Sequence, residues 1–432
     1  MALWLKSGDA DFEDRFKALL ALKREQSADV NDKVASIIAR VREEGDAALI
    51  DLTKTYDGVD LGVAGIRITP AELAAARSLV DAKTLAALKF AHDRILDHHR
   101  RQVPKDDCYK DQQGVELGSR WTAVSSVGLY VPGGTASYPS SVLMNALPAK
   151  VAAVPRVVMV VPAPKNVLNP LVLVAAELAG ISEIYRVGGA QAIAALAYGT
   201  ESIPPVAKVV GPGNAYVAAA KRQVFGHIGI DMVAGPSEVV VIADEDNDPS
   251  WIASDLLAQA EHDEAAQAIL ITDDQDFARA VESAVDSELA VLPRAATARA
   301  SWKDYGAVIL VGSLAEAPSI VDRLAPEHLE IATRKADALA ALINNAGAIF
   351  IGRYTPEVIG DYVAGTNHVL PTARSARFAS GLSVLDFMKR TSILKLDPES
   401  LAALGPAAMV LAEAEGLEAH RRSVAIRLNP RD

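Results

Sequence analysis

The sequence predicts an α/β protein with parallel, doubly wound sheets. From Trp121 onward, short β-rich runs alternate with helical runs, which is typical of βαβ units. The uninterrupted apolar run Val157–Val161 is typical of a strand buried on both faces. A second series of strands and helices begins at Glu238. We therefore expect two similar α/β units in tandem, with a helical segment before them and a small tail after them.

Length and charge narrow the function classes. The chain has 432 residues, half of them hydrophobic, which predicts about two to four domains. Its 43 basic and 55 acidic residues give a net charge of −12, and no basic block stands out. This argues against nucleic acid and anionic membranes as partners. No apolar run approaches the ~18 residues that a membrane span needs. The N-terminal segment soon turns acidic, so we do not expect a signal peptide.

The single cysteine, Cys108, lies in the polar run KDDCYKDQQ. One cysteine cannot form an intramolecular disulfide, which fits a reducing cytoplasm. Cysteine-rich zinc sites are excluded, so a metal would use histidine, carboxylate or amide ligands. A lone cysteine can act as a nucleophile, but the hydrophilic neighbours favour a surface thiol.

The N-terminal region, residues 1–120, is expected to be helical and to pack on the α/β core. Apolar residues recur at helical spacing through residues 10–60. Thr69 and Pro70 predict a capped helix start, and a helical run follows to about Arg101. His92, His98 and His99 lie in this charged run, where a solvated face is favoured over a metal site.

The first α/β unit is assigned to residues 121–237. Its predicted strands are Val124–Val131, Val157–Val161, Ile184–Val187 and Val206–Val210, and its predicted helices are Pro170–Ala179, Ala190–Ala197 and a helix opened by GPGN. Glycine-rich loops follow the strands at Tyr130–Ser141, Arg186–Ala192 and Gly211–Tyr216. Such loops bring backbone N–H groups close to a phosphate, so a nucleotide site is one interpretation. No GxGxxG follows a strand, and glycine-rich loops also form simple tight turns. The loops could therefore be structural turns instead of a nucleotide site.

The second α/β unit is assigned to residues 238–380, with strands EVVVIAD, AILIT, AVILVG and AIFIG separated by helices. The tail, residues 381–432, is expected to hold one or two helices over Pro398–Arg422 and a short strand in VAIRL. It carries Glu415 and His420. Such tails often dock on their own chain or on a partner subunit.

The motif LLAQAEHD, at the end of a predicted helix, carries candidate metal ligands. Gln259 and His262 are three residues apart, which would place both side chains on one helix face. A carbonyl oxygen and a ring nitrogen together suit a divalent metal such as zinc. Two ligands do not complete a site, so other residues must contribute.

Histidines beside acidic residues recur in the C-terminal half. Glu327 directly precedes His328, and Asp361 lies close before His368. Carboxylate–imidazole pairs suit both general acid–base catalysis and zinc binding. Taken singly, each histidine has a structural alternative as a hydrogen-bonded side chain. Adjacent residues in a strand point to opposite faces, so Glu327 and His328 would have different targets unless a strand begins there.

These motifs together resemble the histidinol dehydrogenase family from end to end. The segments that carry the resemblance are GLYVPGGTASYPSSVLMNALPAKVA, RVGGAQAIAALAYGT, VGPGNAYVAAAKR, IDMVAGPSEVVVIAD, LLAQAEHD, PEHLEI, GDYVAGTNHVLPT and GLEAH. The resemblance implies two incomplete Rossmann-like domains in tandem and a homodimer. It also implies one zinc ion per site, held by Gln259, His262, Asp361 and the partner subunit's His420.

The resemblance further implies the reaction. L-histidinol would be oxidised to the aldehyde and then to L-histidine, with one NAD+ reduced in each step. His328 would take the hydroxyl proton and Glu327 would activate water. NAD+ would contact Tyr130, Gln191 and Asn214. The implied substrate contacts, besides the metal ligands, are Ser237, His328, His368 and Glu415.

Three alternatives remain. A related enzyme with the same zinc and NAD machinery would oxidise another polar alcohol, such as a sulfonated diol. A zinc hydrolase would use Glu327 to activate water, which leaves the glycine-rich loops without a role. A metal-stabilised dimer would hold a purely structural site. The sequence does not decide between zinc and manganese, because both accept nitrogen and oxygen ligands.

Overall fold

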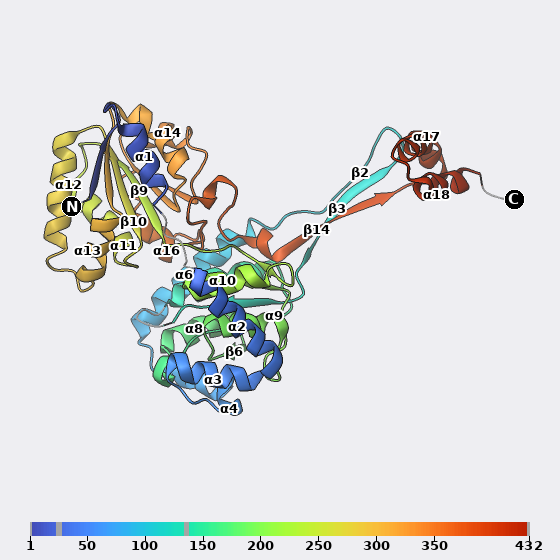
Figure 1. Cartoon of the computed structure of the whole chain (residues 1–432), viewed down its shortest axis with the longest axis horizontal. Coiled ribbons are helices and arrows are strands. Elements are labelled where there is room, and N and C mark those ends of the chain that lie inside the picture. Colours follow the sequence, from blue (N-terminus) through green and yellow to red (C-terminus); the bar gives the residue numbers. More distant parts are fainter. Residues whose placement is uncertain (1, 23–27, 134–137, 430–432) are drawn as a thin grey trace.

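The computed structural model describes residues 2–22, 28–133 and 138–429. Two α/β halves form a body, and an arm projects from it with two helices at its far end (Figure 1). Both halves contain a parallel sheet, so the predicted α/β class with parallel sheets is confirmed. No helix in the described ranges is long and apolar enough to cross a membrane.

The first half contains a five-stranded sheet in which every pairing is parallel. Its strands are β4 (Val127–Tyr130), β5 (Val157–Val160), β6 (Glu183–Tyr185), β7 (Lys208–Val210) and β8 (Gly229–Ile230), in the order β6-β5-β4-β7-β8. The accompanying helices are α7 (Pro139–Val151), α8 (Pro170–Ala179), α9 (Gly189–Tyr198) and α10 (Ala215–Val224). The order reverses between β4 and β7, which creates a crevice at their carboxyl ends.

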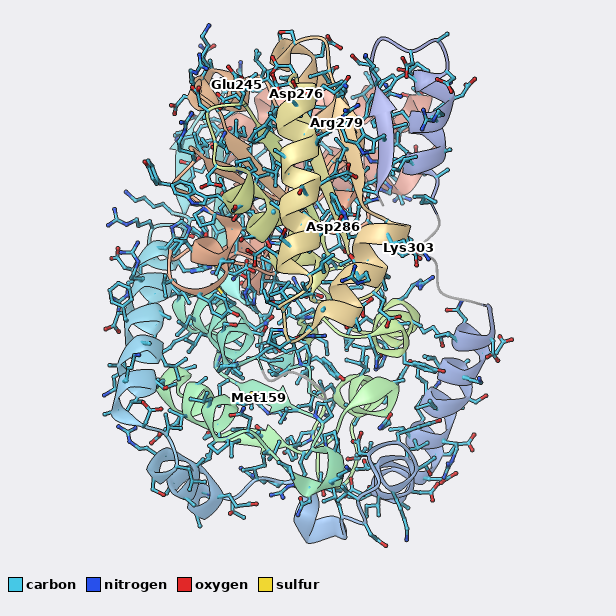
Figure 2. The ribbon with its side chains drawn as sticks, turned by 90° about the vertical axis from the view of Figure 1, so that its left-hand side faces the viewer. Met159, Glu245, Asp276, Arg279, Asp286 and Lys303 are labelled. Carbon is cyan, nitrogen blue, oxygen red and sulfur yellow. The ribbon has the colours of Figure 1, made fainter. Side chains whose placement is uncertain are left out.

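The second half repeats this strand order. Its strands are β9 (Glu238–Ala243), β10 (Gln267–Thr272), β11 (Ala307–Leu310), β12 (His328–Ala332) and β13 (Ala348–Ile351), in the order β11-β10-β9-β12-β13. The helices are α11 (Pro249–Ala260), α12 (Gln275–Glu288), α13 (Ala295–Asp304), α14 (Ala317–Leu324), α15 (Ala336–Ala340) and α16 (Glu357–Tyr362). Exposed Asp276, Arg279 and Asp286 lie along α12 (Figure 2), while Phe277 and Val281 are buried.

The N-terminal region is divided between the two halves. Strand β1 (Leu3–Lys6) pairs in parallel with β11, and α1 (Phe12–Leu20) packs in the same core, although the sequence pattern predicts no strand there. The remaining helices of this region accompany the first sheet: α2 (Ala28–Glu44), α3 (Asp46–Asp57), α4 (Val63–Ile66), α5 (Pro70–Ser78) and α6 (Ala82–Arg100). The predicted helix start at Thr69 is confirmed, because its hydroxyl accepts from the Glu72 backbone N–H in a capping box.

The arm is a three-stranded antiparallel sheet of β2 (Asp107–Lys110), β3 (Glu116–Ala123) and β14 (Met388–Lys395). Helices α17 (Pro398–Ala414) and α18 (Glu418–Leu428) lie at its far end (Figure 1). The predicted strand in VAIRL is wrong, because this segment is the last part of α18. Val424 and Leu428 lie one helical turn apart and both pack closely over Gly405 of α17. Tertiary packing therefore outweighs the β-branched composition here.

Candidate active site

A cavity of about 680 Å³ lies between the two halves of the body. It meets the carboxyl ends of β4 and β7 in the first sheet and the amino ends of β9 and β12 in the second. The sequence candidates that line it are Tyr130, Asn214, Ser237, Gln259, His262, Glu327, His328, Asp361 and His368. Nine side chains from six separated stretches of the chain thus share one cavity.

Gln259 lies in the last turn of α11, but His262 lies two residues beyond the end of the helix. The predicted shared helix face is therefore wrong. A turn replaces it, in which the His262 backbone N–H donates to the Gln259 carbonyl over 3.2 Å. Gln259 is 1% exposed, and its Oε1 has no hydrogen-bond partner among the described residues. A buried amide oxygen without a donor suits a cation, so the donor set fits a metal.

His262 is open to the cavity, yet the surrounding protein still lowers the pKa of its imidazole, while Asp361 acts in the opposite direction. A neutral imidazole offers a lone pair to a metal. Asp361 lies in α16, and its Oδ1 is 3.4 Å from His328 Nε2. Burial raises the pKa of Asp361, but the hydrogen bond and charge of His328 outweigh this and hold it below its usual value.

Gln259, His262 and Asp361 offer one amide, one imidazole and one carboxylate. Within residues 2–22, 28–133 and 138–429 of the single chain, no three His, Cys, Asp or Glu side chains are arranged to hold a metal. A tetrahedral site built on these three residues needs a fourth ligand from elsewhere.

Glu327 and His328 lie where β12 begins, and both line the cavity. Glu327 is 5% exposed, its Oε2 accepts the Glu238 backbone N–H at 3.1 Å, and burial raises its pKa to about 7. His328 Nδ1 lies 3.2 Å from the Glu238 carbonyl oxygen, which can only accept, so Nδ1 carries a hydrogen. Nε2 faces Asp361 Oδ1 at 3.4 Å, and although burial lowers the pKa of His328, the nearby carboxylates Glu357, Glu327 and Asp361 raise it above its usual value.

His368 and Ser237 complete the polar wall of the cavity. His368 Nδ1 lies 3.0 Å from the Asp361 carbonyl oxygen, and its Nε2 lies 3.2 Å from the Ser141 hydroxyl. Because the carbonyl accepts only, Nδ1 donates to it and Nε2 accepts from Ser141. Burial lowers the pKa of His368, which favours this neutral form. His368 thereby also ties α7 to the segment that carries Asp361.

The first half contributes Tyr130 and the loop that begins at Gly211. Asn214 caps α10, where its Oδ1 accepts from the Tyr216 and Val217 backbone N–H groups. Tyr130 is buried, and its hydroxyl accepts from the Gly189 N–H at 3.1 Å. Gln191 is buried in α9 and does not line the cavity. Residues 134–137 of the first glycine-rich loop lie outside the described residues.

A buried ion pair supports that loop. Lys221 and Asp231 are in contact with side chains 2% and 1% exposed. Lys221 Nζ donates to the Gly211 carbonyl at 2.9 Å, and Asp231 Oδ2 accepts the Gly211 N–H at 2.8 Å. Gly211 has φ +112°, and a Cβ there would lie 2.2 Å from the Tyr130 carbonyl oxygen. Only glycine fits at this position. Neither Lys221 nor Asp231 is predicted from the sequence as a functional residue.

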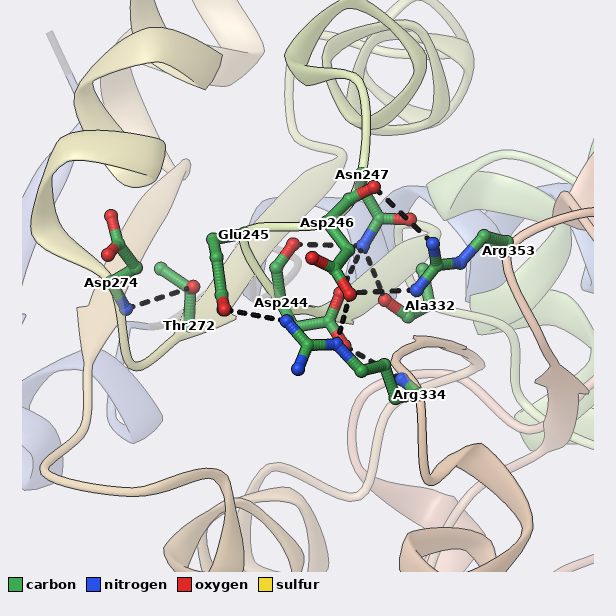
Figure 3. A network of polar contacts seen from close by, with 9 residues as sticks. All are labelled: Asp244, Glu245, Asp246, Asn247, Thr272, Asp274, Ala332, Arg334 and Arg353. Atoms are coloured by element: carbon green, nitrogen blue, oxygen red, sulfur yellow. Dashed lines mark hydrogen bonds and ion pairs between the residues drawn. The ribbon is translucent and has the colours of Figure 1, made fainter.

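Glu415 and His420 do not reach this cavity within one chain. Glu415 caps the end of α17 and His420 lies in α18, both exposed at the far end of the arm (Figure 1). The carboxyl edge of the second sheet is a separate region. There, Asp244 and Asp246 bond with Arg334 and Arg353, and Asn247 donates to Asp244 and to the Ala332 carbonyl (Figure 3). The charged groups at this edge are paired with one another. The cavity with the candidate residues lies at the opposite edge, where β9 and β12 begin.

Comparison with known proteins gives one consistent family. The histidinol dehydrogenase family model matches residues 20–428. The chain is 66% identical to a histidinol dehydrogenase of Mesorhizobium japonicum over 99% of this chain and 100% of that protein. It is 68% identical to one of Rhizobium meliloti, covering 99% of each. A crystal structure of the Elizabethkingia anophelis histidinol dehydrogenase superposes with TM-score 0.94 at 34% identity, over 99% of this chain and 98% of that one. The chain therefore belongs to the histidinol dehydrogenase family.

Proposed function

We propose that this protein oxidises L-histidinol through L-histidinal to L-histidine, with NAD+ as the electron acceptor and zinc in the site. One observation carries the proposal. The cavity brings the Glu327–His328 pair and the unpartnered Oε1 of Gln259 together with the glycine-rich loop at Asn214. A base, a metal-binding surface and a phosphate-binding loop are the parts that such an oxidation needs.

Gln259, His262 and Asp361 would hold the zinc ion together with the partner subunit's His420. When bound, the metal supplies a fixed anchor that orients the substrate. The single chain offers three nitrogen or oxygen ligands around one cavity, and its own His420 lies far away at the end of the arm. A homodimer in which each arm reaches the neighbouring subunit would complete the ligand set.

The exposed surface of the arm supports this assembly. Val410 and Leu411 in α17 are 66% and 64% exposed, and Ile426 in α18 is 62% exposed. Large apolar side chains gathered on a small projecting helical pair favour contact with another protein surface. Glu415 lies close to His420 in sequence, so the same arm would bring Glu415 to the substrate as well.

In its neutral form, His328 would take the hydroxyl proton of the substrate at Nε2, because Nδ1 is held by the Glu238 carbonyl. Loss of that proton allows the carbon-bound hydrogen to leave as hydride to NAD+, giving the aldehyde. Glu327 would then take a proton from a water molecule that adds to the aldehyde carbon. The hydrate would lose a hydroxyl proton and pass its carbon-bound hydrogen as hydride to a second NAD+, which gives the carboxylic acid. Ser237 and His368 line the cavity and would contact the substrate from its polar wall.

Among the described residues, no cysteine lines the cavity, so the second oxidation cannot proceed through a covalent thiol adduct of the aldehyde. Cys108 is exposed in β2 of the arm and does not line the cavity. A hydrated aldehyde formed with a carboxylate base requires no covalent enzyme intermediate. Glu327, with its pKa raised to about 7, is matched to proton transfer near neutral pH.

The first half would bind NAD+ through Tyr130, Gln191 and Asn214. We infer that both sheets are incomplete Rossmann-like units. If β4 is counted as the first strand of one sheet and β9 as the first strand of the other, the strands of each half follow the order 3-2-1-4-5. Residues 121–237 would supply the NAD+ side and residues 238–380 the zinc side. The tail of residues 381–432 would serve the partner subunit. The cytoplasm is the expected compartment.

The test is the amount of NADH formed per L-histidinol consumed by zinc-loaded protein, with the product identified. Two NADH and L-histidine are expected. A protein that reduces NAD+ with a sulfonated diol but not with histidinol would be the related alcohol dehydrogenase. Absence of NAD+ binding by calorimetry would favour a zinc hydrolase, and zinc binding without any turnover would indicate a structural site.

A further inference from the structure

Three acidic residues lie behind the cavity without lining it: half-buried Asp255 in α11, and buried Glu330 in β12 and Glu357 at the start of α16. Glu330 and Glu357 are 3% and 2% exposed. Glu330 Oε1 accepts the Glu357 backbone N–H at 2.5 Å, and the Glu330 carboxyl is hydrogen-bonded to the Asp255 carboxyl. One side chain in a central strand thus bonds to two different helices.

Each of these elements also carries a residue of the proposed site. Gln259 follows Asp255 by one turn of α11, and Asp361 follows Glu357 by one turn of α16. His328 precedes Glu330 by two residues in β12, so both side chains lie on the same face of the strand. Glu330 therefore connects the three elements that carry two proposed metal ligands and the proposed base, namely α11, α16 and β12.

The Asp255–Glu330 contact requires a proton. Two ionised carboxylates repel, and a hydrogen bond between them forms only when one is protonated. Burial raises the pKa of Asp255 to about 6. Burial, and then repulsion from Asp255 and Glu357, raises the pKa of Glu330 well above its usual value. The pair accordingly keeps one proton near neutral pH, and the protonated carboxyl donates a hydrogen bond to the other.

We propose that Glu330 is a positioning residue that clamps α11 and α16 to β12 through a proton shared with Asp255, and that this clamp sets the spacing of the metal ligands. The inference rests on the proposed function for the identity of those ligands. The titratable groups around the clamp are Asp255 of α11, Glu357 and Asp361 of α16, and Glu327 and His328 beside Glu330. This surrounding charge is largely acidic, so the clamp is expected to hold while the shared proton is present and to loosen in alkaline solution.

Two substitutions separate the parts of the proposal. Glu330→Gln keeps an oxygen for the Glu357 N–H and offers an N–H donor to Asp255, so it replaces the shared proton permanently. Glu330→Leu removes both bonds and leaves the Glu357 N–H and Asp255 without partners. The control is Ser301→Ala in α13, which removes a buried hydrogen bond to the Ala266 carbonyl in the same half of the body.

The first measurement is amide hydrogen exchange in the metal-free protein, in peptides covering residues 255–262 and 357–362. We expect Glu330→Leu to accelerate exchange in both peptides by about tenfold or more, because a buried hydrogen bond is lost at each helix. Glu330→Gln and Ser301→Ala should match wild type there. After correction for intrinsic rates, wild-type protection should fall from neutral to alkaline pH, whereas protection in Glu330→Gln should not.

The second measurement is zinc affinity by competition with a chelator. Glu330→Leu should weaken zinc binding about tenfold or more, and Glu330→Gln and Ser301→Ala should leave it close to wild type. The proposal is overturned if Glu330→Leu matches wild type in exchange and affinity, or if Glu330→Gln is as impaired as Glu330→Leu. If Glu330→Leu fails to fold, the test is the pH dependence of amide exchange in the other two proteins. The proposal then requires protection to fall at alkaline pH in wild type and to stay constant in Glu330→Gln. A wild-type protein that binds no zinc would refute the proposed function, and exchange in the metal-free protein would still decide on the clamp.

Discussion

The Nδ1 atom of His328 lies 3.8 Å from Oε2 of Glu327, although the two residues are adjacent in the chain. In the middle of a strand their side chains would point to opposite faces. Strand β12 begins at His328, so Glu327 still has loop geometry, and both side chains reach the same cavity. In the proposed mechanism, a base for the alcohol and a base for water would therefore act on the same substrate carbon.

We expect Glu327→Gln to impair the aldehyde oxidation more than the alcohol oxidation. The amide cannot deprotonate water, whereas His328 keeps its bond to the Glu238 carbonyl. Loss of a general base costs about 10²–10⁴-fold in rate. Single-turnover assays started from histidinol and from histidinal would measure each step. Glu264→Gln, an exposed change two residues beyond His262, is the control and should leave both steps intact. Equal losses in the two steps would contradict the separate roles.

The stability of the metal-free protein should report the raised pKa of Glu327. Its pKa is about 7 in the folded chain against a usual 4.5, so the folded state holds the proton more tightly than the unfolded state. This contribution is fully present below about pH 4.5 and is lost as the pH rises to about 7, by up to roughly 3 kcal/mol in total. Denaturant unfolding of wild type and Glu327→Gln across that range should show their free-energy difference changing with pH. A difference that stays constant with pH would exclude this shift.

Mixed dimers test whether the arm serves the partner subunit. His262→Ala and His420→Ala should each abolish activity as homodimers. In a mixed dimer, the body of the His420→Ala subunit is intact and receives His420 from its neighbour, so one active site is restored. Co-refolding of the two inactive variants, followed by an NADH assay, makes the measurement. If each arm served its own chain, the mixture would stay inactive.

The Lys221–Asp231 pair should matter for both stability and NAD+ binding. Asp231→Ala leaves the Lys221 charge buried and frees the Gly211 N–H. We expect an unfolding free energy lower by about 3–5 kcal/mol and a raised KM for NAD+. Chemical denaturation and steady-state kinetics would measure these changes. Asp60→Ala, in an exposed pair with Lys54, should change neither quantity. A stable Asp231→Ala protein with normal KM would show that the pair does not support the loop.

The sequence by itself determined the class of the fold and most of the candidate residues. Alternation of apolar strands such as Val157–Val160 with helices such as Pro170–Ala179 is a local pattern, since burial on both faces of a parallel strand requires apolar side chains throughout. Histidine, carboxylate and glycine motifs are equally local, because their chemistry belongs to the residue type. They identified Glu327, His328 and Gln259 without any structure.

Tertiary structure alone decided where these residues meet. The carboxyl edge of the first sheet faces the amino edge of the second, and nothing in a single strand specifies that pairing. Leu3–Lys6 became a strand because β11 offered a free edge, and VAIRL became a helix because Val424 and Leu428 pack on Gly405. The acids behind the site, Glu330 and Asp255, have no motif of their own. Their role depends on burial and on a neighbour in another element, which the local sequence does not encode.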